Sequence, residues 1–159
     1  MPEVFVGLGA NLGEPAAQLK TALLAIGALP QTTVKKVSAF YRSAPIGPAG
    51  QPDYCNAVAE LETALGPQAL LDALLAIEDR AGRLRGERWG ARVLDLDLLL
   101  YGQVVCSTAR LTLPHPELAL RDFVLQPLAE IAPDVKVPLM GRARDLLAQL
   151  PAPTLAEWA

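Results

Sequence analysis

The sequence predicts one globular domain in which helices and strands are mixed, and three observations lead to this prediction. The chain has 159 residues, which is a common size for a single domain. Segments that alternate apolar and polar residues, as strands do, are separated by segments with the helical period of about 3.6 residues. The composition, 52% hydrophobic and 19% charged, is typical of a folded protein. We therefore expect residues 1–159 to form a single domain.

Charge and cysteine usage exclude several classes of protein. The formal net charge of −3 argues against a surface that neutralises a nucleic-acid backbone. No stretch approaches the roughly 20 apolar residues of a membrane helix, and the first residues lack the pattern of a secretory signal. Cys55 and Cys106 lie far apart in the sequence, which favours reduced thiols. We expect a cytoplasmic monomer without nucleic-acid or membrane partners.

The first half of the chain predicts strands on both sides of a long loop. Residues 4–6 predict a short strand, followed by a glycine loop through Gly13 and a helix that begins near Pro15. In residues 32–42 and 54–62, side chains of different polarity alternate as they do in strands. The segment between them is rich in Pro and Gly. In the second of these strands, Tyr54 and Asn56 share a face, because successive side chains point to opposite sides.

The second half begins with an amphipathic helix. Residues 67–81 have the helical period, with five apolar side chains expected to pack inward: Leu70, Leu71, Leu74, Leu75 and Ile77. Glu78 continues this stripe, and an ion pair with a nearby arginine is the plain explanation for it. A strand is expected over residues 93–101, with two further helices near residues 121–131 and 142–150.

An acidic pair lies on the strand over residues 93–101. Even positions there are all leucine, so one face belongs to the core and both Asp95 and Asp97 lie on the other, about 6.5 Å apart. Two carboxylates that close resist ionisation unless a cation compensates them. Magnesium suits such a pair, since it combines a few carboxylates with water and phosphate oxygens. A structural network of ion pairs with arginines remains the alternative.

An arginine-rich segment directly precedes the acidic strand. Five of the ten arginines lie between Arg80 and Arg92, in a stretch that also holds three glycines and Trp89. Guanidinium groups bind phosphate oxygens in bidentate fashion, and glycines allow a loop to move. The segment is typical of a phosphate clamp that closes over its ligands, although a solvated basic loop is the alternative reading.

The glycines near the N-terminus do not indicate a dinucleotide site. Gly7, Gly9 and Gly13 are spaced GxGxxxG, one residue longer than the dinucleotide-binding fingerprint, and no acidic residue lies about twenty positions further on. The chain also lacks the GxxxxGK[ST] pattern of a phosphate-binding P-loop. A metal and arginines would have to hold any nucleotide phosphates.

Four ordered segments resemble the 6-hydroxymethyl-7,8-dihydropterin pyrophosphokinase family of folate synthesis. They lie at residues 9–13, 51–56, 87–97 and 113–116, and the third, ERWGARVLDLD, is the most specific. The resemblance implies an α+β fold with a ferredoxin-like core, in which helices pack on an antiparallel sheet. It also implies ATP as co-substrate and two Mg²⁺ ions. The pterin hydroxyl would attack the β-phosphorus of ATP and release AMP.

The resemblance also assigns candidate residues. Asp95 and Asp97 would hold magnesium, and Arg83 and Arg92 would stabilise charge on the transferred group. The pterin would stack between Tyr54 and Phe123, the flat faces that such a ring favours, and the Asn56 amide would bind its edge. Further pterin contacts would come from Ser43, Ala44, Ile46 and Trp89. ATP contacts would come from Glu78, Arg85, Arg88, Leu98, Arg110, Thr112, His115 and Arg121.

The chain departs from the family at Leu75, Gly86 and Pro116, where some members carry a glutamine, a longer basic stretch and an aromatic residue. Two other functions stay open. One is a non-catalytic nucleotide-sensing domain on the same fold, because a fold alone does not fix a function. The other is binding of single-stranded RNA, against which the acidic charge counts.

Overall fold

The computed structural model describes residues 2–44, 50, 52–81, 94–151 and 155–158. Its centre is a five-stranded sheet in which the order is β2-β4-β1-β5 and β3 also pairs with β4. Every pairing in this sheet is antiparallel. The strands are β1 (Val4–Ala10), β2 (Thr32–Val37), β3 (Tyr41–Ser43), β4 (Tyr54–Thr63) and β5 (Asp95–Tyr101).

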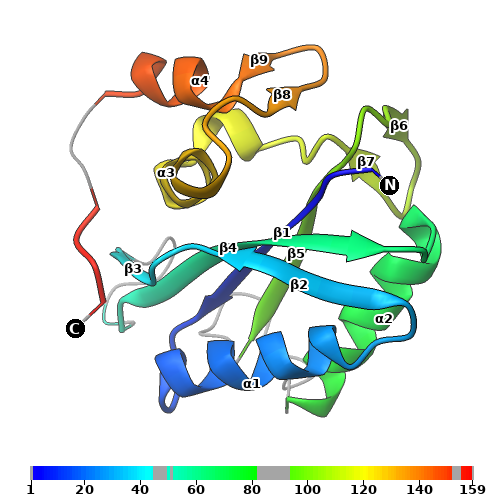
Figure 1. Ribbon diagram of the computed structural model, residues 1–159. Helices are drawn as coiled ribbons and strands as arrows, with labels where there is room; N and C mark the ends of the chain where they lie inside the picture. The colour runs from blue at the N-terminus through cyan, green and yellow to red at the C-terminus, as the bar shows by residue number, and fades with distance from the viewer. Residues whose placement is uncertain (1, 45–49, 51, 82–93, 152–154, 159) are drawn as a thin grey trace.

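Helices cover both faces of this sheet (Figure 1). Helices α1 (Pro15–Gly27) and α2 (Pro67–Arg80) lie on one face, and α3 (Asp122–Ile131) lies on the other with α4 (Ala143–Gln149) beside it. The remaining elements are two short hairpins, β6 (Cys106–Ser107) with β7 (Thr112–Leu113) and β8 (Lys136–Val137) with β9 (Gly141–Arg142), and the 3-10 helix η1 (Leu118–Leu120). This arrangement confirms the α+β class expected from the sequence.

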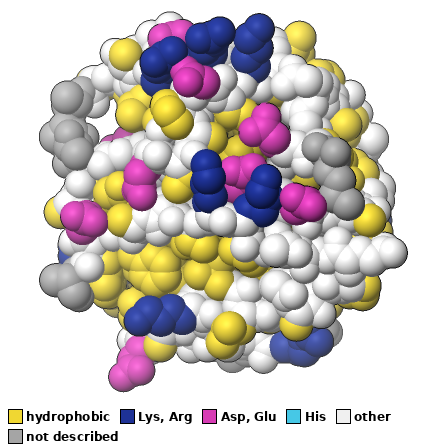
Figure 2. Space-filling model, in the orientation of Figure 1, with side chains coloured by type: hydrophobic (Ala, Val, Ile, Leu, Met, Phe, Trp, Pro, Cys, Tyr) yellow, Lys and Arg dark blue, Asp and Glu magenta, His cyan; other side chains and the backbone are white. Residues whose placement is uncertain are grey.

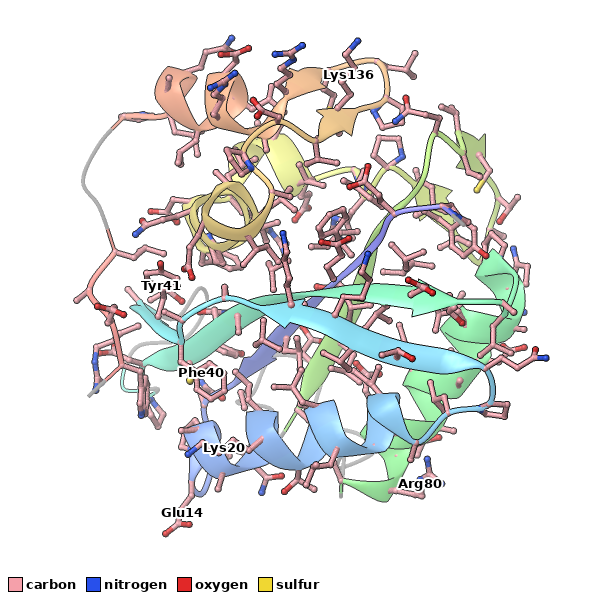
Figure 3. All side chains as sticks on the ribbon, viewed as in Figure 1. Glu14, Lys20, Phe40, Tyr41, Arg80 and Lys136 are labelled. Carbon is pink, nitrogen blue, oxygen red and sulfur yellow. The ribbon has the colours of Figure 1, made fainter. Side chains whose placement is uncertain are left out.

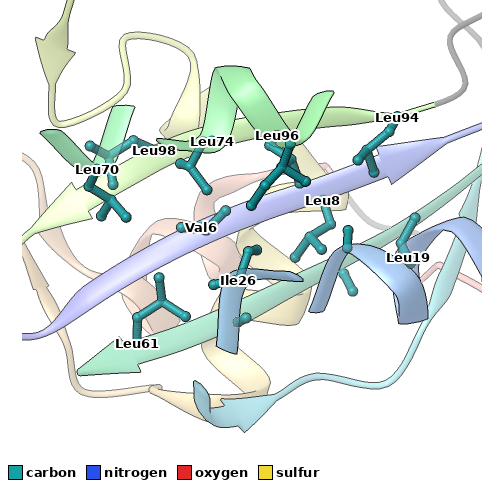
Figure 4. Close-up of a cluster of buried hydrophobic side chains, with 14 of the residues drawn as sticks. Val6, Leu8, Leu19, Ile26, Leu61, Leu70, Leu74, Leu94, Leu96 and Leu98 are labelled. Atoms are coloured by element: carbon teal, nitrogen blue, oxygen red, sulfur yellow. The ribbon is translucent and has the colours of Figure 1, made fainter. Parts of the chain in front are cut away.

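The sheet separates two layers of core. Inward-facing side chains of α1 and α2, spaced at helical intervals, pack on one face of β1, β4 and β5 (Figure 4). That layer includes Val6, Leu8, Leu19, Ile26, Leu61, Leu70, Leu74, Leu94, Leu96 and Leu98. The second layer lies under α3 and α4 and includes Phe5, Val58, Leu99, Leu100, Leu118, Leu125, Leu128 and Leu146. The parity predicted for residues 54–62 is confirmed, since Cys55, Ala57, Ala59 and Leu61 belong to the first layer and Val58 to the second.

Two predicted elements have different limits in the structure. Strand β1 continues to Ala10, so Gly7 and Gly9 belong to a strand and the expected glycine loop begins later. The strand expected over residues 32–42 is interrupted, because the Ser38 hydroxyl oxygen accepts the hydrogen bond of the Val58 N–H at 3.0 Å. A side chain thus replaces a backbone acceptor between β2 and β3.

A bulge changes the alternation predicted for β5. Val6 pairs with Leu98 and Phe5 with Leu100, so Leu99 is an extra residue in the ladder. Leu94, Leu96 and Leu98 face α2 as expected, but Leu99 and Leu100 both belong to the layer under α3. The prediction that all even leucines share one face is therefore wrong at Leu100.

Two further observations concern the surface. Leu75 is 40% exposed, so its predicted inward packing is wrong. On the face shown in Figure 2, Lys and Arg side chains are interspersed with Asp and Glu. No helix within the described part of the chain is long and apolar enough to cross a membrane.

Candidate functional site

Two rows of residues cross the middle of the sheet and define the floor of the candidate site. Gly9 of β1 lies opposite Asn56 of β4 and Asp95 of β5. One step along, Gly7 lies opposite Val58 and Asp97. Directly opposed residues of antiparallel strands point to the same face, here the face that α3 covers. The two glycines therefore leave open space between a buried amide and the acidic pair.

The first cavity lies over this floor and has a volume of 170 Å³. Tyr54 and Phe123 contribute aromatic surface, and Ser43 and Asn56 contribute polar groups. The acidic pair also lines this cavity. The complete lining is Gly7, Leu8, Gly9, Ser43, Ala44, Tyr54, Asn56, Ala57, Asp95, Asp97, Arg121, Phe123 and Val124. Aromatic faces with a few fixed polar groups suit a flat heteroaromatic molecule.

The amide of Asn56 is buried and held by a neighbour. Its Oδ1 accepts a hydrogen bond from the Ser43 hydroxyl, with an oxygen to oxygen distance of 2.5 Å. Asn56 as a whole is only 7% exposed. Ser43 and Tyr54 lie opposite each other in the β3–β4 pair, so the two strands bring three of the predicted pterin contacts together.

Contacts hold residues on either side of the turn from β3 to β4, at Arg42 of β3 and just before β4. The Asn11 side chain, which follows β1, donates a hydrogen bond to the carbonyl oxygen of Pro52 at 3.1 Å. On the β3 side, the Arg42 guanidinium lies 3.5 Å from the Asp53 carboxylate and 4.1 Å from the centre of the Trp158 ring. These contacts position Tyr54 and Ser43 at the rim of the first cavity.

Glu130 connects α3 to the sheet. Its carboxylate accepts hydrogen bonds from the Tyr41 hydroxyl and from the backbone N–H of Ala39, the latter at 3.0 Å. Figure 3 shows Tyr41 rising toward α3, whereas Phe40 points toward α1. Burial, then the hydrogen bond to Glu130 and its charge, raise the pKa of Tyr41 to about 12. Since α3 also carries Phe123, this contact fixes one aromatic wall of the first cavity.

The second cavity lies on the other side of the acidic pair, between α2, the edge of β5 and residues 108–116, and has a volume of 360 Å³. Its apolar part includes Leu71 and Leu75. Its polar part includes Glu78, Thr108, Arg110, Thr112 and His115, together with Asp95 and Asp97. Leu98 and Pro116 also line it. The two aspartates thus line both cavities.

Glu78 supports the edge of β5. One carboxylate oxygen, Oε2, accepts a hydrogen bond of 2.6 Å from the backbone N–H of Leu96, the residue between the two aspartates. The sequence suggested an ion pair with arginine or a contact with ATP for this residue. The structure adds a structural contact that fixes the strand on which the acidic pair lies.

His115 lies at the junction of the second cavity with η1. Burial, and then the positive charge of Arg121, lower the pKa of its imidazole, against the opposing effects of Glu117 and Asp95. Its Nδ1 accepts a hydrogen bond from the backbone N–H of Glu117 at 3.2 Å, which suits a neutral ring. The backbone N–H of His115 also donates to the Leu99 carbonyl at 2.9 Å, which holds this segment on β5.

The two described arginines of the candidate site lie in different places. Arg110 lines the second cavity and pairs with Asp72 and Gln68 of α2. Arg121, for which the sequence predicts an ATP contact, lines the first cavity, where it pairs with Glu117 and lies over the Phe123 ring. The remaining predicted residues, Ile46, Arg83, Arg85, Arg88, Trp89 and Arg92, lie outside the described residues, as does Gly86.

Sequence reasoning missed several residues that the structure brings to the site. The prediction of a loop at Gly7 and Gly9 is wrong, and their alternation with Val6, Leu8 and Ala10 is the signal of a strand. Val124 and Ala57 line the first cavity, and no feature of the sequence distinguishes them from core residues. Leu71 and Thr108 of the second cavity are equally inconspicuous.

The acidic pair fits a hard divalent cation that shares its ligands with a substrate. Both carboxylates are half-buried and line two cavities. Among the described residues, no group of three or more His, Cys, Asp or Glu side chains could hold a metal. Magnesium does not need such a group, since it is commonly bound by one or two carboxylates and completes its octahedron with water and phosphate oxygens.

Comparisons with known proteins point to one family. Residues 5–133 match the family model described as 7,8-dihydro-6-hydroxymethylpterin-pyrophosphokinase (HPPK). The chain is 50% identical to the 2-amino-4-hydroxy-6-hydroxymethyldihydropteridine pyrophosphokinase of Haemophilus influenzae, over 94% of this chain and 93% of that protein. It is 49% identical to the protein of the same name from Pseudomonas aeruginosa, over 93% of this chain and 91% of that protein.

Solved structures show the same fold at much lower identity. The HPPK-DHPS of Plasmodium falciparum, crystallised with pteroate, superimposes with a TM-score of 0.73 at 12% identity, covering 92% of this chain. An HPPK-DHPS in complex with substrates superimposes with a TM-score of 0.72 at 12% identity, again over 92% of this chain. This chain spans less than half of those longer proteins, 42% and 43% respectively.

Proposed function

Because the chain belongs to the 7,8-dihydro-6-hydroxymethylpterin-pyrophosphokinase family, we propose that it transfers a pyrophosphoryl group from ATP to 6-hydroxymethyl-7,8-dihydropterin, a step of folate biosynthesis. One structural observation carries the proposal beyond family membership. Two cavities of different chemistry meet at Asp95 and Asp97. A reaction between a flat ring substrate and a nucleotide requires this arrangement, in which both ligands reach the same pair of carboxylates.

The proposed chemistry is a single displacement at phosphorus. The hydroxymethyl oxygen of the pterin forms a bond to the β-phosphorus of ATP. The bond from that phosphorus to the oxygen that bridges it to the α-phosphorus breaks, so AMP leaves with that oxygen. The hydroxyl proton passes to solvent. Transfer of this kind depends mainly on positioning and on stabilisation of charge.

The first cavity is proposed to bind the pterin. Tyr54 and Phe123 supply aromatic faces for stacking, and Asn56, held by Ser43, supplies hydrogen-bonding groups for the edge of the ring. Ala44 lies in the same lining, and Ile46 and Trp89 are assigned to the pterin by the family resemblance alone. This orientation directs the hydroxymethyl arm toward the acidic pair.

The second cavity is proposed to bind ATP. Arg110, Thr112 and His115 offer polar groups, while Leu71, Leu75 and Leu98 offer apolar surface for the adenine. Arg85 and Arg88 are assigned to ATP by the resemblance. Because Nδ1 of His115 accepts from the Glu117 N–H, the proton of the neutral ring lies on Nε2, which can donate to the nucleotide but has no lone pair to accept the proton of the pterin hydroxyl.

Asp95 and Asp97 are proposed to hold two magnesium ions together with the phosphates of ATP. Magnesium at this position would withdraw charge from the phosphate oxygens. The chain's own contribution is to fix both carboxylates on one strand, which Glu78 supports through the Leu96 N–H. Arg83 and Arg92 are proposed to stabilise the charge that develops on the transferred group. We further propose that residues 1–159 form a single pyrophosphokinase domain that works in the cytosol.

The experiment is incubation of the chain with Mg·ATP and 6-hydroxymethyl-7,8-dihydropterin, followed by separation of the nucleotides. AMP and the pterin diphosphate should appear in equal amounts. Formation of ADP in place of AMP would indicate an ordinary kinase, which transfers a single phosphoryl group. Binding of both ligands without turnover would favour the non-catalytic nucleotide-sensing function.

A further inference from the structure

Gly9 and Asn56 approach each other unusually closely at the floor of the first cavity. A β-carbon built on Gly9 would lie 3.0 Å from Nδ2 of Asn56, and the next nearest atom, Cδ1 of Tyr54, would lie 3.8 Å away. The first distance is shorter than ordinary van der Waals contact, while the second is normal. The amide of Asn56 therefore occupies the space that a side chain at position 9 would need.

The amide cannot easily give way on its other side. Its Oδ1 accepts the hydrogen bond from the Ser43 hydroxyl at 2.5 Å, and the residue is 7% exposed. A hydroxyl can donate to an amide oxygen, whereas that oxygen cannot donate. With Oδ1 turned toward Ser43, the NH₂ group of Asn56 lies toward Gly9 and the cavity.

We propose that Ser43 and Gly9 are positioning residues that together hold the Asn56 amide in one orientation, so that its Nδ2 donates to an acceptor on the edge of the ring substrate. Ser43 fixes the amide oxygen, and the missing side chain at Gly9 lets the NH₂ end lie close to β1. The inference rests on the proposed function, because it concerns how the same cavity selects its pterin.

The arrangement also explains why this glycine differs from its neighbour in β1. A β-carbon on Gly7 would meet only the Leu99 side chain, at 3.5 Å, which is ordinary contact. Both glycines line the cavity, but only Gly9 approaches a polar group that is itself held by a hydrogen bond. The close approach at Gly9 is therefore part of substrate selection and not a general requirement of the strand.

The test is a double-mutant cycle between positions 9 and 56, with KM measured separately for the pterin and for ATP. Gly9→Ala should raise KM for the pterin about tenfold, the loss expected for one hydrogen bond at a buried site, and leave KM for ATP within about twofold. In an Asn56→Ala background, the same Gly9→Ala change should have no further effect on KM for the pterin, because its target is gone.

Two more variants separate positioning from loss of structure. Ser43→Ala should also raise KM for the pterin selectively, since the amide then loses its fixed orientation. Gly27→Ala, on the exposed end of α1 with its nearest atom 3.8 Å away, is the matched glycine control and should leave both KM values unchanged. Thermal unfolding of each variant shows whether the fold is retained.

The outcomes distinguish the inference from the function on which it rests. If Gly9→Ala raises KM for the pterin equally in the wild-type and Asn56→Ala backgrounds, while the wild type converts the pterin, the positioning role alone is overturned. A parallel rise of both KM values overturns it as well. A wild-type chain that neither binds nor converts the pterin overturns the proposed function and the inference together.

Discussion

Glu78 accepts a hydrogen bond from the backbone of Leu96, the residue that separates the two aspartates of the candidate metal site. Its side chain is 2% exposed, so this carboxylate replaces the missing partner strand at the edge of β5. The contact makes a residue of α2 part of the support of the acidic pair.

Replacement of Glu78 by Ala should reduce the free energy of unfolding by about 1–3 kcal/mol, because the buried N–H of Leu96 loses its acceptor. Glu78→Gln keeps an acceptor oxygen of the same reach and should lose less. Urea unfolding of the three proteins measures the difference. Equal stability of the Ala and Gln variants would show that the hydrogen bond contributes little.

Replacement of Asp97 by Asn should lower kcat by about 100-fold or more, because one metal-binding carboxylate is lost while its shape is kept. The melting temperature should stay close to that of the wild type. Asp134→Asn is the control, since Asp134 is exposed and pairs with Arg144 away from both cavities. An Asp97→Asn variant with wild-type kcat would contradict the metal assignment.

Alkaline pH should weaken the attachment of α3 to the sheet. The pKa of Tyr41 is raised from 10.0 to about 12, first by burial and then by Glu130, so the folded state favours the protonated phenol. This contribution to stability is complete below pH 10 and is lost as the pH rises from 10 to 12. Urea midpoints between pH 8 and 12 should therefore fall more steeply in the wild type than in Tyr41→Phe.

A matched tyrosine gives the control for this pH dependence. Tyr101 donates a hydrogen bond to the Leu65 carbonyl on the other side of the sheet, at 2.5 Å. Tyr101→Phe should lower stability because it removes this hydrogen bond, and should keep the part of the pH dependence that comes from Tyr41. If the urea midpoint of Tyr41→Phe falls with pH as steeply as that of the wild type, the loss of stability at alkaline pH does not come from Tyr41.

Replacement of Trp158 by Ala should disturb the first cavity more than the second. The Trp158 ring packs on the core and on the Arg42 guanidinium, next to the strand that carries Ser43. A loss of about 1–2 kcal/mol is expected for a partly buried ring of this size. KM for the pterin should rise more than KM for ATP. A rise in KM for ATP alone would show that Trp158 does not support the first cavity.

Much of the fold was predictable because its signals are local. The parity of residues 54–62 follows from the alternation of a strand, and it correctly placed Tyr54 and Asn56 on the face away from Cys55 and Ala59. The helices likewise follow from apolar residues at helical spacing. The α+β class required the family resemblance, since strand order depends on contacts between distant segments.

The errors have physical reasons. Gly7 and Gly9 lie within β1 although glycine is unfavourable in strands, because here they form the open floor of a cavity. The bulge at Leu99 could not be predicted, because it depends on how β5 registers with β1. The contact of Glu78 with Leu96 and the place of Arg121 beside Phe123 are additions to the predictions for these residues, and they depend on tertiary packing that no spacing encodes.

The C-terminal residues give β3 a second neighbour. The Arg42 N–H donates to the Ala156 carbonyl at 2.8 Å, and the Trp158 N–H donates to the Phe40 carbonyl at the same distance. Gln126 of α3 holds the backbone of Leu155 at 2.7 Å. These partners are among the most distant in the sequence. During synthesis on the ribosome, the outer backbone groups of β3 therefore stay unpaired until residue 158 has emerged. Until then these groups can form hydrogen bonds with other chains.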